Sequence, residues 1–334
     1  MEVVAGVVTV AEATDVSEAR RRASDVARAL ALDEVTSGRV ALVVTEAATN
    51  LLKHAGGGDV FVGATGTGQH PGVQVIAMDR GPGMHSVADS LKDGFSTAGT
   101  TGTGLGAIGR SSESFDLYTT AKGTVVAASI YADRARNGAP PIGAVCVPLR
   151  GEYRCGDAWA AWSAGGLTSV MVVDGLGHGH EAAIASDLAV NVFRRHAERS
   201  APDVIALVHA ALKPTRGAAV ALAELDERAG KLRYCAIGNI SALVARPDGH
   251  EQRLVSLPGI AGHVARRVQT FTYDWLPGSL LVMHSDGVGT HWSLAKYEGL
   301  LSHRPDVIAG VLYRDHRRPA DDATAVVTRH GGAA

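Results

Sequence analysis

The chain has few cysteines, few aromatic residues and almost no net charge. Its 334 residues include three cysteines and 5% aromatic residues, and the formal charge at pH 7 is −2. The cysteines are odd in number and form no Cys-x-x-Cys pair, which favours a reducing, cytoplasmic compartment over a disulfide framework. The near-neutral charge gives no support for a nucleic-acid partner.

Long apolar runs are also absent. No run approaches the roughly 18 to 20 residues that a bilayer span requires, and the N-terminus lacks the basic-then-apolar pattern of a signal peptide. We therefore expect a cytoplasmic protein without a membrane partner. Hydrophobic residues make up 46% of the chain and charged residues 20%, which is typical of globular proteins with room for two cores.

A short polar segment divides the chain. Residues 132–142 contain Asp, Arg, Asn, Gly and a Pro-Pro pair, and Pro and Gly interrupt regular structure. This composition predicts a linker at 132–142 between domains at 1–131 and 143–330. Runs of strands and runs of helices, rather than strict alternation, predict the α+β class for the chain.

The helix predicted at residues 34–55 carries polar side chains that suit a nucleotide site. Glu46, Asn50 and His54 are spaced four residues apart, which places them on one helix face. An amide oxygen can ligate Mg²⁺, and a carboxylate can orient or deprotonate a nucleophile. Periodicity alone leaves the alternative that Glu46 and Asn50 are only the polar side of an amphipathic helix. We interpret His54 as structural.

A glycine-rich stretch follows two predicted strands. An apolar strand at 73–78 leads into Asp79 and a Gly-Pro-Gly turn, and further glycines lie at positions 99, 102, 104, 106 and 109. Glycine lets a backbone approach a ligand closely, and a helix start near Leu105 would offer free N–H groups to an anion. A flexible linker has a similar composition, so this stretch alone allows both interpretations.

Taken together, these segments resemble the three boxes of the GHKL (Bergerat-fold) ATPases and kinases, and most closely the RsbT-like serine kinases. The resemblance covers residues 3–130. It implies an α/β two-layer sandwich that binds ATP and Mg²⁺. The likeness lies in Glu46-x-x-x-Asn50, Asp79-x-Gly81-x-Gly83 and Gly102-x-Gly104-x-Gly106.

The resemblance also implies roles for these residues. Glu46 would be the general base for the attacking hydroxyl, Asn50 would hold Mg²⁺ on the phosphates, and Asp79 would accept a hydrogen bond from the adenine amino group. The other implied cofactor-binding positions are glycines of the turn and of the ATP lid, namely Gly81, Gly83, Gly102, Gly104 and Gly106.

The second half carries four acidic positions near predicted strand ends. They are Asp157, Asp174, Asp286 and the pair Asp321-Asp322. Aspartates at strand ends can converge on one sheet rim, where hard oxygen ligands suit Mg²⁺ or Mn²⁺. A single Asp-Gly is more often a turn than a ligand, but four in this order favour a metal site.

These positions resemble the metal-dependent protein phosphatases (PPM family) in the RsbX/SpoIIE-like branch, over about residues 143–329. The resemblance implies an α-β-β-α sandwich with two Mn²⁺ or Mg²⁺ ions that activate a water molecule. Asp174 would be catalytic and would bridge the metals. The implied cluster is completed by the Gly175 carbonyl, Asp157, Asp286 and Asp321, with Asp322 the less favoured member of its pair.

A His-x-His pattern at His178 and His180 suggests zinc at first sight. No Cys-x-x-Cys and no further histidine ligand set accompanies it in the sequence. We therefore favour a structural or supporting role for both histidines.

The two resemblances imply a bifunctional partner-switching regulator. The first domain would phosphorylate Ser or Thr on a STAS-domain antagonist, in a module tied to a sigma factor or a stressosome-like complex. The second would dephosphorylate the same or a related phosphoprotein. The alternative is an anti-sigma-like module that only binds ATP and its partner, with the phosphatase as the one active enzyme. An ATPase of the Hsp90 or MutL type fits poorly, because those proteins need long extra domains.

Overall fold

The chain forms two compact units in a computed structural model that describes residues 5–67, 70–84, 86–87, 104–132, 142–264 and 268–331. The first unit comprises residues 1–137 and 302–314, and the second comprises 138–301 and 315–334. This division differs from the predicted domains at 302–314, which lie with the first unit. Most of the predicted linker 132–142 lies outside the described residues.

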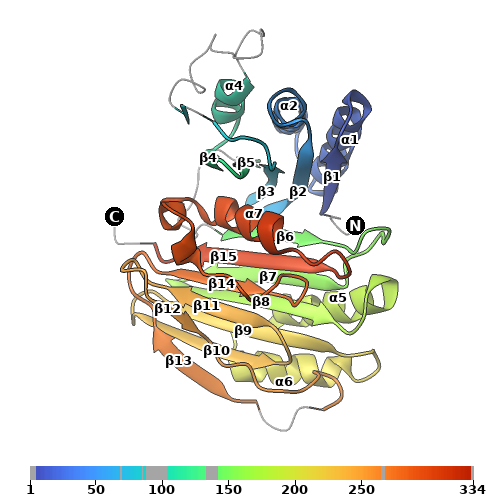
Figure 1. The fold of residues 1–334 in the computed structure, drawn as a ribbon. Coiled ribbons are helices and arrows are strands. Elements are labelled where there is room, and N and C mark those ends of the chain that lie inside the picture. Colours follow the sequence, from blue (N-terminus) through green and yellow to red (C-terminus); the bar gives the residue numbers. More distant parts are fainter. Residues whose placement is uncertain are drawn as a thin grey trace. The chain divides into compact units, whose positions relative to one another are not determined.

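The first unit is built on a five-stranded antiparallel sheet with the strand order β1-β2-β3-β5-β4. Helices α1, α2 and α4 pack against this sheet around one apolar core (Figure 1). The arrangement is the predicted α/β two-layer sandwich. Its elements are β1 (Gly6–Val10), α1 (Ala13–Ala29), α2 (Glu34–Asn50), η1 (Leu51–Ala55), β2 (Gly58–Thr67), β3 (His70–Met78), α4 (Gly104–Ser111), β4 (Ser114–Thr120) and β5 (Gly123–Tyr131).

Helix α2 is fixed at its start and along one face. The Asp33 carboxylate accepts a hydrogen bond of 2.7 Å from the Thr36 backbone N–H, which satisfies one of the free donors of the first turn. Val40, Val43 and Val44 are fully buried in the core. Each buried side chain of this size contributes roughly 1.5 to 3 kcal/mol. The polar face that carries Glu46 is therefore directed away from the core.

The segment 302–314 supplies most of helix α7 (Pro305–His316) and packs closely within the first unit. A Cβ atom on Gly310 would lie 2.8 Å from Cγ2 of Ile76 and 2.9 Å from Cγ1 of Val125. Near one end, the Asp116 carboxylate accepts a 2.7 Å hydrogen bond from the Arg304 backbone N–H. Glycine at position 310 thus permits the helix to approach β3 and β5.

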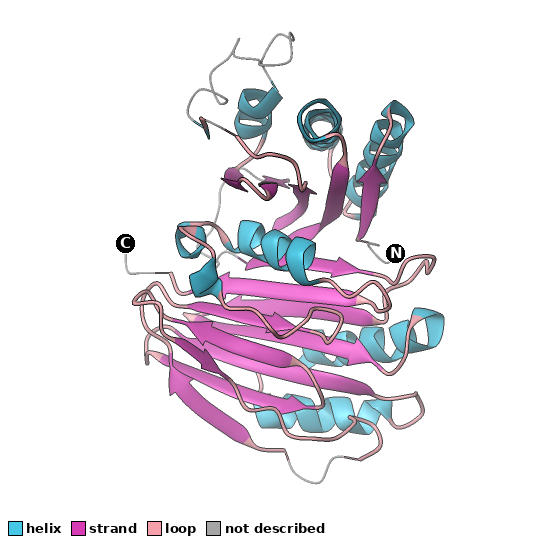
Figure 2. Ribbon diagram, in the orientation of Figure 1, coloured by secondary structure: helices cyan, strands magenta, loops and turns pink. Residues whose placement is uncertain are grey.

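The second unit contains two five-stranded sheets, with strand orders β13-β10-β9-β8-β7 and β12-β11-β14-β15-β6 (Figure 2). Helices and strands of this part of the chain are β6 (Ile142–Val147), β7 (Asp157–Ala164), β8 (Leu167–Gly175), α5 (Gly179–His196), α6 (Ala201–Leu212), β9 (Ala218–Asp226), β10 (Lys231–Ile237), β11 (Ser241–Ala245), β12 (Glu251–Arg253), β13 (Thr270–Asp274), β14 (Leu280–His284), η2 (Leu294–Lys296), η3 (Leu300–Ser302) and β15 (Ala323–Arg329).

Two apolar clusters hold this unit together. One joins helices α5 and α6 to the sheet of β7 to β10, around Phe193, Ile205 and Leu222. The other lies between the two sheets and includes Tyr234 and Met283. Stacked sheets with helices on an outer face confirm the predicted α+β class and the sandwich expected of the second half. Within the residues that the structure describes, no helix is long and apolar enough to cross a membrane.

The last residue of β14, His284, is a buried imidazole. It is 2% exposed, and its Nδ1 lies 2.8 Å from the Ser285 carbonyl oxygen, to which it donates. Its ring lies 5.6 Å from that of Trp292, measured between centroids. Burial lowers the pKa of His284 to about 4, so the folded protein holds this side chain neutral.

We expect this histidine to make stability depend on pH. Because an unfolded histidine titrates near 6.5, the unfolded state takes up a proton that the folded state excludes, and stability falls as pH drops from about 6.5 to about 4. Between pH 7 and pH 5 this single group should lower the free energy of unfolding by about 2 kcal/mol. Urea unfolding followed by tryptophan fluorescence measures the second unit, since all four tryptophans lie there.

The His284→Asn variant should lose less stability over this pH interval than the native chain. His250, which is exposed on a turn, provides the matched control, and His250→Asn should behave like the native chain. An equal loss in the native chain and in His284→Asn would contradict this assignment.

Candidate active sites

Asp79 follows β3 and is held in one orientation. Its Oδ1 accepts hydrogen bonds from the backbone N–H groups of Gly81, at 2.8 Å, and Thr124, at 3.1 Å. The Asp79 N–H donates in turn to the Thr124 carbonyl at 2.9 Å. No described residue donates a hydrogen bond to Oδ2. The carboxylate therefore presents one fixed acceptor to a ligand.

Gly81 and Gly83 are required by the chain's own packing. A Cβ on Gly81 would lie 2.9 Å from the Ala55 Cβ. Gly83 has a φ of +76°, and a Cβ there would lie 2.2 Å from the Thr120 carbonyl oxygen. Any other residue at either position would displace the turn. Their predicted approach to an adenine base stays a prediction.

The first and third predicted boxes meet at the start of α4. A Cβ on Gly104 would lie 3.0 Å from Oδ1 of Asn50 and 3.1 Å from Oε2 of Glu46. Gly106 lies in the first turn of the same helix, whereas Gly102 lies outside the described residues. Positions more than fifty residues apart in sequence thus form one polar site.

Asn50 has an unused donor in this site. Its Nδ2 atom is buried, and among the described residues no atom accepts a hydrogen bond from it. A buried amide without a partner is costly, so this group suits a bound ligand. The amide and carboxylate of Asn50 and Glu46, beside a helix start, fit a phosphate group with a hard cation.

The predicted single helix 34–55 is two elements. Helix α2 ends at Asn50, and a π-helical turn, η1, continues to Ala55 before Gly56 takes a left-handed conformation. π-helical turns are rare in proteins, and those that do occur are often found at functional sites. The wider turn removes His54 from the regular four-residue spacing, and its side chain is exposed. This agrees with leaving His54 out of the site.

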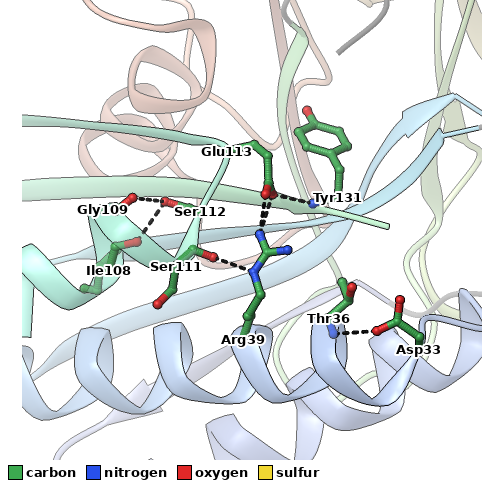
Figure 3. Close-up of polar contacts among 9 residues, drawn as sticks. All are labelled: Asp33, Thr36, Arg39, Ile108, Gly109, Ser111, Ser112, Glu113 and Tyr131. Carbon is green, nitrogen blue, oxygen red and sulfur yellow. Dashed lines mark hydrogen bonds and ion pairs between the residues drawn. The ribbon is translucent and has the colours of Figure 1, made fainter. Parts of the chain in front are cut away.

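A partly buried ion pair holds α4 against α2 (Figure 3). Nη2 of Arg39 lies 2.5 and 2.6 Å from the two carboxylate oxygens of Glu113, and its Nε donates to the Ser111 carbonyl at 3.1 Å. The Glu113 carboxylate also accepts from the Tyr131 N–H at 3.0 Å. Arg39 thus ties the end of α4 to the helix that carries Glu46.

In the second unit, strand register brings two predicted ligands together. Asp157 at the start of β7 pairs directly with Asp174 near the end of β8. Asp157 is 4% exposed, and its Oδ2 accepts a 2.6 Å hydrogen bond from the Ser285 hydroxyl. The Ser285 oxygen accepts in turn from the Thr324 N–H at 3.0 Å. Ser285, the residue after β14, and Thr324 of β15 therefore fix the Asp157 side chain.

Burial and mutual repulsion raise the pKa values of these carboxyl groups. Burial, followed by the negative charges of Asp157 and Asp286, raises the pKa of Asp174 to about 9. Burial also raises the pKa of Asp157, and burial and Asp286 raise that of Asp321. Asp286 accepts a 2.7 Å hydrogen bond from Nδ2 of Asn239. A group of acids that resists ionisation in this way is stabilised by bound cations.

Asp322 has a different position from Asp321. Its two oxygens accept hydrogen bonds from the backbone N–H groups of Leu149, at 2.7 Å, and Gly156, at 3.0 Å. A carboxylate used in this way organises the loop before β7. That Asp321 is the ligand of the pair stays a prediction.

The donor set fits a hard divalent cation. Asp157, Asp174, Asp286 and the Gly175 carbonyl are all oxygen donors, and Mg²⁺ typically binds one or two carboxylates and keeps several waters. Among the described residues no three His, Cys, Asp or Glu side chains are grouped to hold a metal by themselves. Water and the carbonyl would therefore complete the coordination.

His178 and His180 have partners of their own. Nδ1 of His178 lies 2.9 Å from a Glu152 oxygen, and Nδ1 of His180 lies 3.5 Å from Nη1 of Arg154. Both interactions connect the start of α5 to the loop before β7. This fits the structural role expected for both histidines.

Sequence reasoning assigned no role to Ser285 or Asn239, although both orient predicted ligands. Ser285 is adjacent to Asp286, so the Ser-Asp-Gly triplet was an available local signal. Asn239 lies 47 residues from its partner Asp286, and nothing in its neighbourhood indicated the contact.

Comparison with known families covers both units. Residues 164–331, about half of the chain, match the family described as Stage II sporulation protein E (SpoIIE). Residues 9–130 match the family described as a histidine kinase-like ATPase domain. The chain belongs to the SpoIIE family of phosphatases, with an ATPase-like domain at its N-terminus.

Two relatives from Bacillus subtilis (strain 168) match the two parts of this SpoIIE-family chain. The chain is 32% identical over 115 residues to the serine/threonine-protein kinase RsbT, covering 34% of this chain and 86% of RsbT. It is 24% identical over 138 residues to the phosphoserine phosphatase RsbX, covering 41% of this chain and 69% of RsbX.

Solved structures agree on the fold. A structure described under "The bacterial stressosome: a modular system that has been adapted to control secondary messenger signaling" matches with a TM-score of 0.53 and 27% identity, covering 57% of this chain and all of that chain. RsbX in complex with magnesium matches with a TM-score of 0.51 and 20% identity, covering 58% and 97%. The two family matches and the two Bacillus relatives confirm the resemblance to the GHKL and PPM families.

We expect Arg39→Met to loosen helix α4. It would remove the Arg39 guanidinium from the largely buried Glu113 carboxylate, which costs about 3 kcal/mol. Hydrogen exchange in peptides spanning residues 104–111 of the full chain should accelerate accordingly.

Arg28→Met provides the control, because Arg28 pairs with Asp25 on an exposed helix surface and its loss should change stability by less than about 1 kcal/mol. If both variants exchange at the same rate, the Arg39–Glu113 pair does not hold α4.

Proposed function

We propose that this protein adds a phosphate to a partner protein and also removes it. The first unit would be a Ser/Thr kinase that uses ATP and Mg²⁺, and the second a phosphatase that uses two Mn²⁺ or Mg²⁺ ions. The observation that carries the kinase half is the meeting of Gly104 with Glu46 and Asn50. It places a carboxylate, an amide and a helix start in one site.

In the kinase half, each residue has a separate task. The second oxygen of Asp79 would accept a hydrogen bond from the adenine amino group. Glu46 would accept the proton of the substrate's Ser or Thr hydroxyl. As the proton leaves, the oxygen of that hydroxyl forms a bond to the γ-phosphorus, and the bond between the γ-phosphorus and ADP breaks. Asn50 would hold Mg²⁺, which when bound neutralises phosphate charge. The first turn of α4 would offer N–H groups to the phosphates.

In the phosphatase half, four carboxylates and one backbone carbonyl would bind the metal ions. Asp174, Asp157, Asp286, Asp321 and the Gly175 carbonyl would hold the ions. When bound, two such ions lower the pKa of water and neutralise phosphoryl oxygens. Ser285 keeps Asp157 in place through its 2.6 Å hydrogen bond, and Asn239 does the same for Asp286 at 2.7 Å. The chain needs no phosphorylated side chain of its own.

The printed names of the relatives support the proposed class of partner. RsbT is named as a serine/threonine-protein kinase, RsbX as a phosphoserine phosphatase, and one structural relative comes from work on the bacterial stressosome. We infer that the substrate is a STAS-domain antagonist in a partner-switching module that regulates a sigma factor. Both activities acting on one phosphoprotein would let the protein set its phosphorylation level.

We expect Glu46→Gln to abolish transfer but not nucleotide binding. With Asp174→Asn also present, so that hydrolysis cannot hide the product, transfer from γ-labelled ATP to a STAS-domain protein should fall by roughly 100-fold or more. The ATP dissociation constant should change by less than about threefold.

Glu34→Gln is the matched control for this test, because Glu34 is exposed in the first turn of the same helix. If the Glu46→Gln chain still transfers phosphate at the control rate, the first unit does not use Glu46 as its base. If even the control fails to transfer while it binds ATP, the first unit is a binding module.

We expect hydrolysis of a phosphoserine peptide to require Mn²⁺ or Mg²⁺. Removal of the metal with EDTA should abolish the rate, and Asp174→Asn should lower it by roughly 100-fold or more, since it removes a carboxylate that would hold the ions. Asp248→Asn, on an exposed turn, is the control. An EDTA-treated chain that keeps its rate would contradict the metal mechanism.

A further inference from the structure

Two of the three cysteines face each other beside the carboxylate cluster. Sγ of Cys146, on β6, lies 3.6 Å from Sγ of Cys155, in the loop before β7. Both are free thiols, with Cys146 buried and Cys155 partly exposed. Strands β6 and β7 belong to different sheets of the second unit. A bond between these two sulfurs would therefore link the two sheets.

We propose that Cys146 and Cys155 are a dithiol that a peroxide converts into a disulfide, and that this bond restrains the phosphatase site. A disulfide needs its sulfurs at about 2.05 Å, so the pair requires a movement of only about 1.5 Å. Pairs that form in this way inside cells are typically redox-sensing rather than structural. The regulatory part of this proposal rests on the phosphatase function proposed above.

The chemistry balances with hydrogen peroxide as the oxidant. The partly exposed Cys155 sulfur attacks the peroxide, the O–O bond breaks, and a sulfenic acid and one water form. The Cys146 sulfur then attacks the sulfenic sulfur, the S–S bond forms, the S–O bond breaks, and the released hydroxide takes the remaining thiol proton as a second water. Each sulfur loses one electron, and the two peroxide oxygens gain these electrons.

The loop that would move is part of the site's framework. Gly156, the next residue after Cys155, donates its N–H to Asp322 at 3.0 Å and accepts a hydrogen bond from the Gly175 N–H at 3.0 Å. Sγ of Cys146 also lies 3.6 Å from the Asp157 carbonyl oxygen. Changes in groups that support metal ligands typically cost 10- to 100-fold in affinity or activity. We therefore expect the oxidised form to be the less active one.

The first experiment detects the Cys146–Cys155 disulfide directly and does not depend on an activity assay. The full chain is treated with hydrogen peroxide and digested with trypsin under non-reducing conditions. Arg150 and Arg154 lie between the two cysteines, so trypsin places them on separate peptides, and a Cys146–Cys155 disulfide appears as a linked pair that dithiothreitol releases. Cys155→Ala should abolish this species, and Cys235→Ala, at a fully buried position on β10, should leave it unchanged. Failure of the native chain to form the linked pair would overturn the proposal.

The second experiment measures the effect. Oxidation should lower the Mn²⁺-dependent rate on a phosphoserine peptide by roughly tenfold, with recovery in dithiothreitol, in the native chain and in Cys235→Ala but not in Cys155→Ala. A linked pair that forms without any loss of rate would overturn the regulatory role. If the reduced chain has no phosphatase rate, the proposed function fails, while the peptide experiment still decides whether the dithiol exists.

Discussion

Repulsion between carboxylates at the open end of the β7–β8 hairpin, opposite its turn, constrains the second unit. Strand register sets Asp157 opposite Asp174, and burial removes the water that would otherwise screen their charges. Hydrogen bonds offset part of this repulsion: the Ser285 hydroxyl donates to Asp157, and the Asn239 amide donates to Asp286. What these bonds leave uncompensated is negative charge, which divalent cations neutralise. This crowding of carboxylates is the basis on which we propose a metal site here.

The first unit is constrained by space more than by charge. Gly104 starts α4 where a Cβ would lie only 3.0 Å from Oδ1 of Asn50 and 3.1 Å from Oε2 of Glu46. The ion pair between Arg39 and Glu113 then fixes the far end of the helix. The close approach of Gly104 forms the site, and the Arg39–Glu113 ion pair holds α4 in the position that the site requires. The nucleotide chemistry proposed for this unit depends on both.

Local sequence order was enough to predict the parts of the sites that lie near strand ends. Asp79 and its turn follow directly from β3, and Asp157 and Asp174 flank a hairpin, so their proximity follows from strand pairing. Contacts that depend on how separate elements pack could not be predicted in this way, whether the residues are 74 positions apart, as Arg39 and Glu113 are, or nine, as Cys146 and Cys155 are. The π-helical turn after Asn50 and the packing of residues 302–314 with the first unit also have no local signal.

The proposed function requires one chain to act on the same phosphoprotein in both directions. It is tested most directly by the steady-state phosphate occupancy of a STAS-domain protein, measured by intact mass spectrometry in the presence of ATP, Mg²⁺ and Mn²⁺. We expect the highest occupancy with Asp174→Asn, a lower one with the native chain, and none with Glu46→Gln. Equal occupancy with all three chains would contradict it.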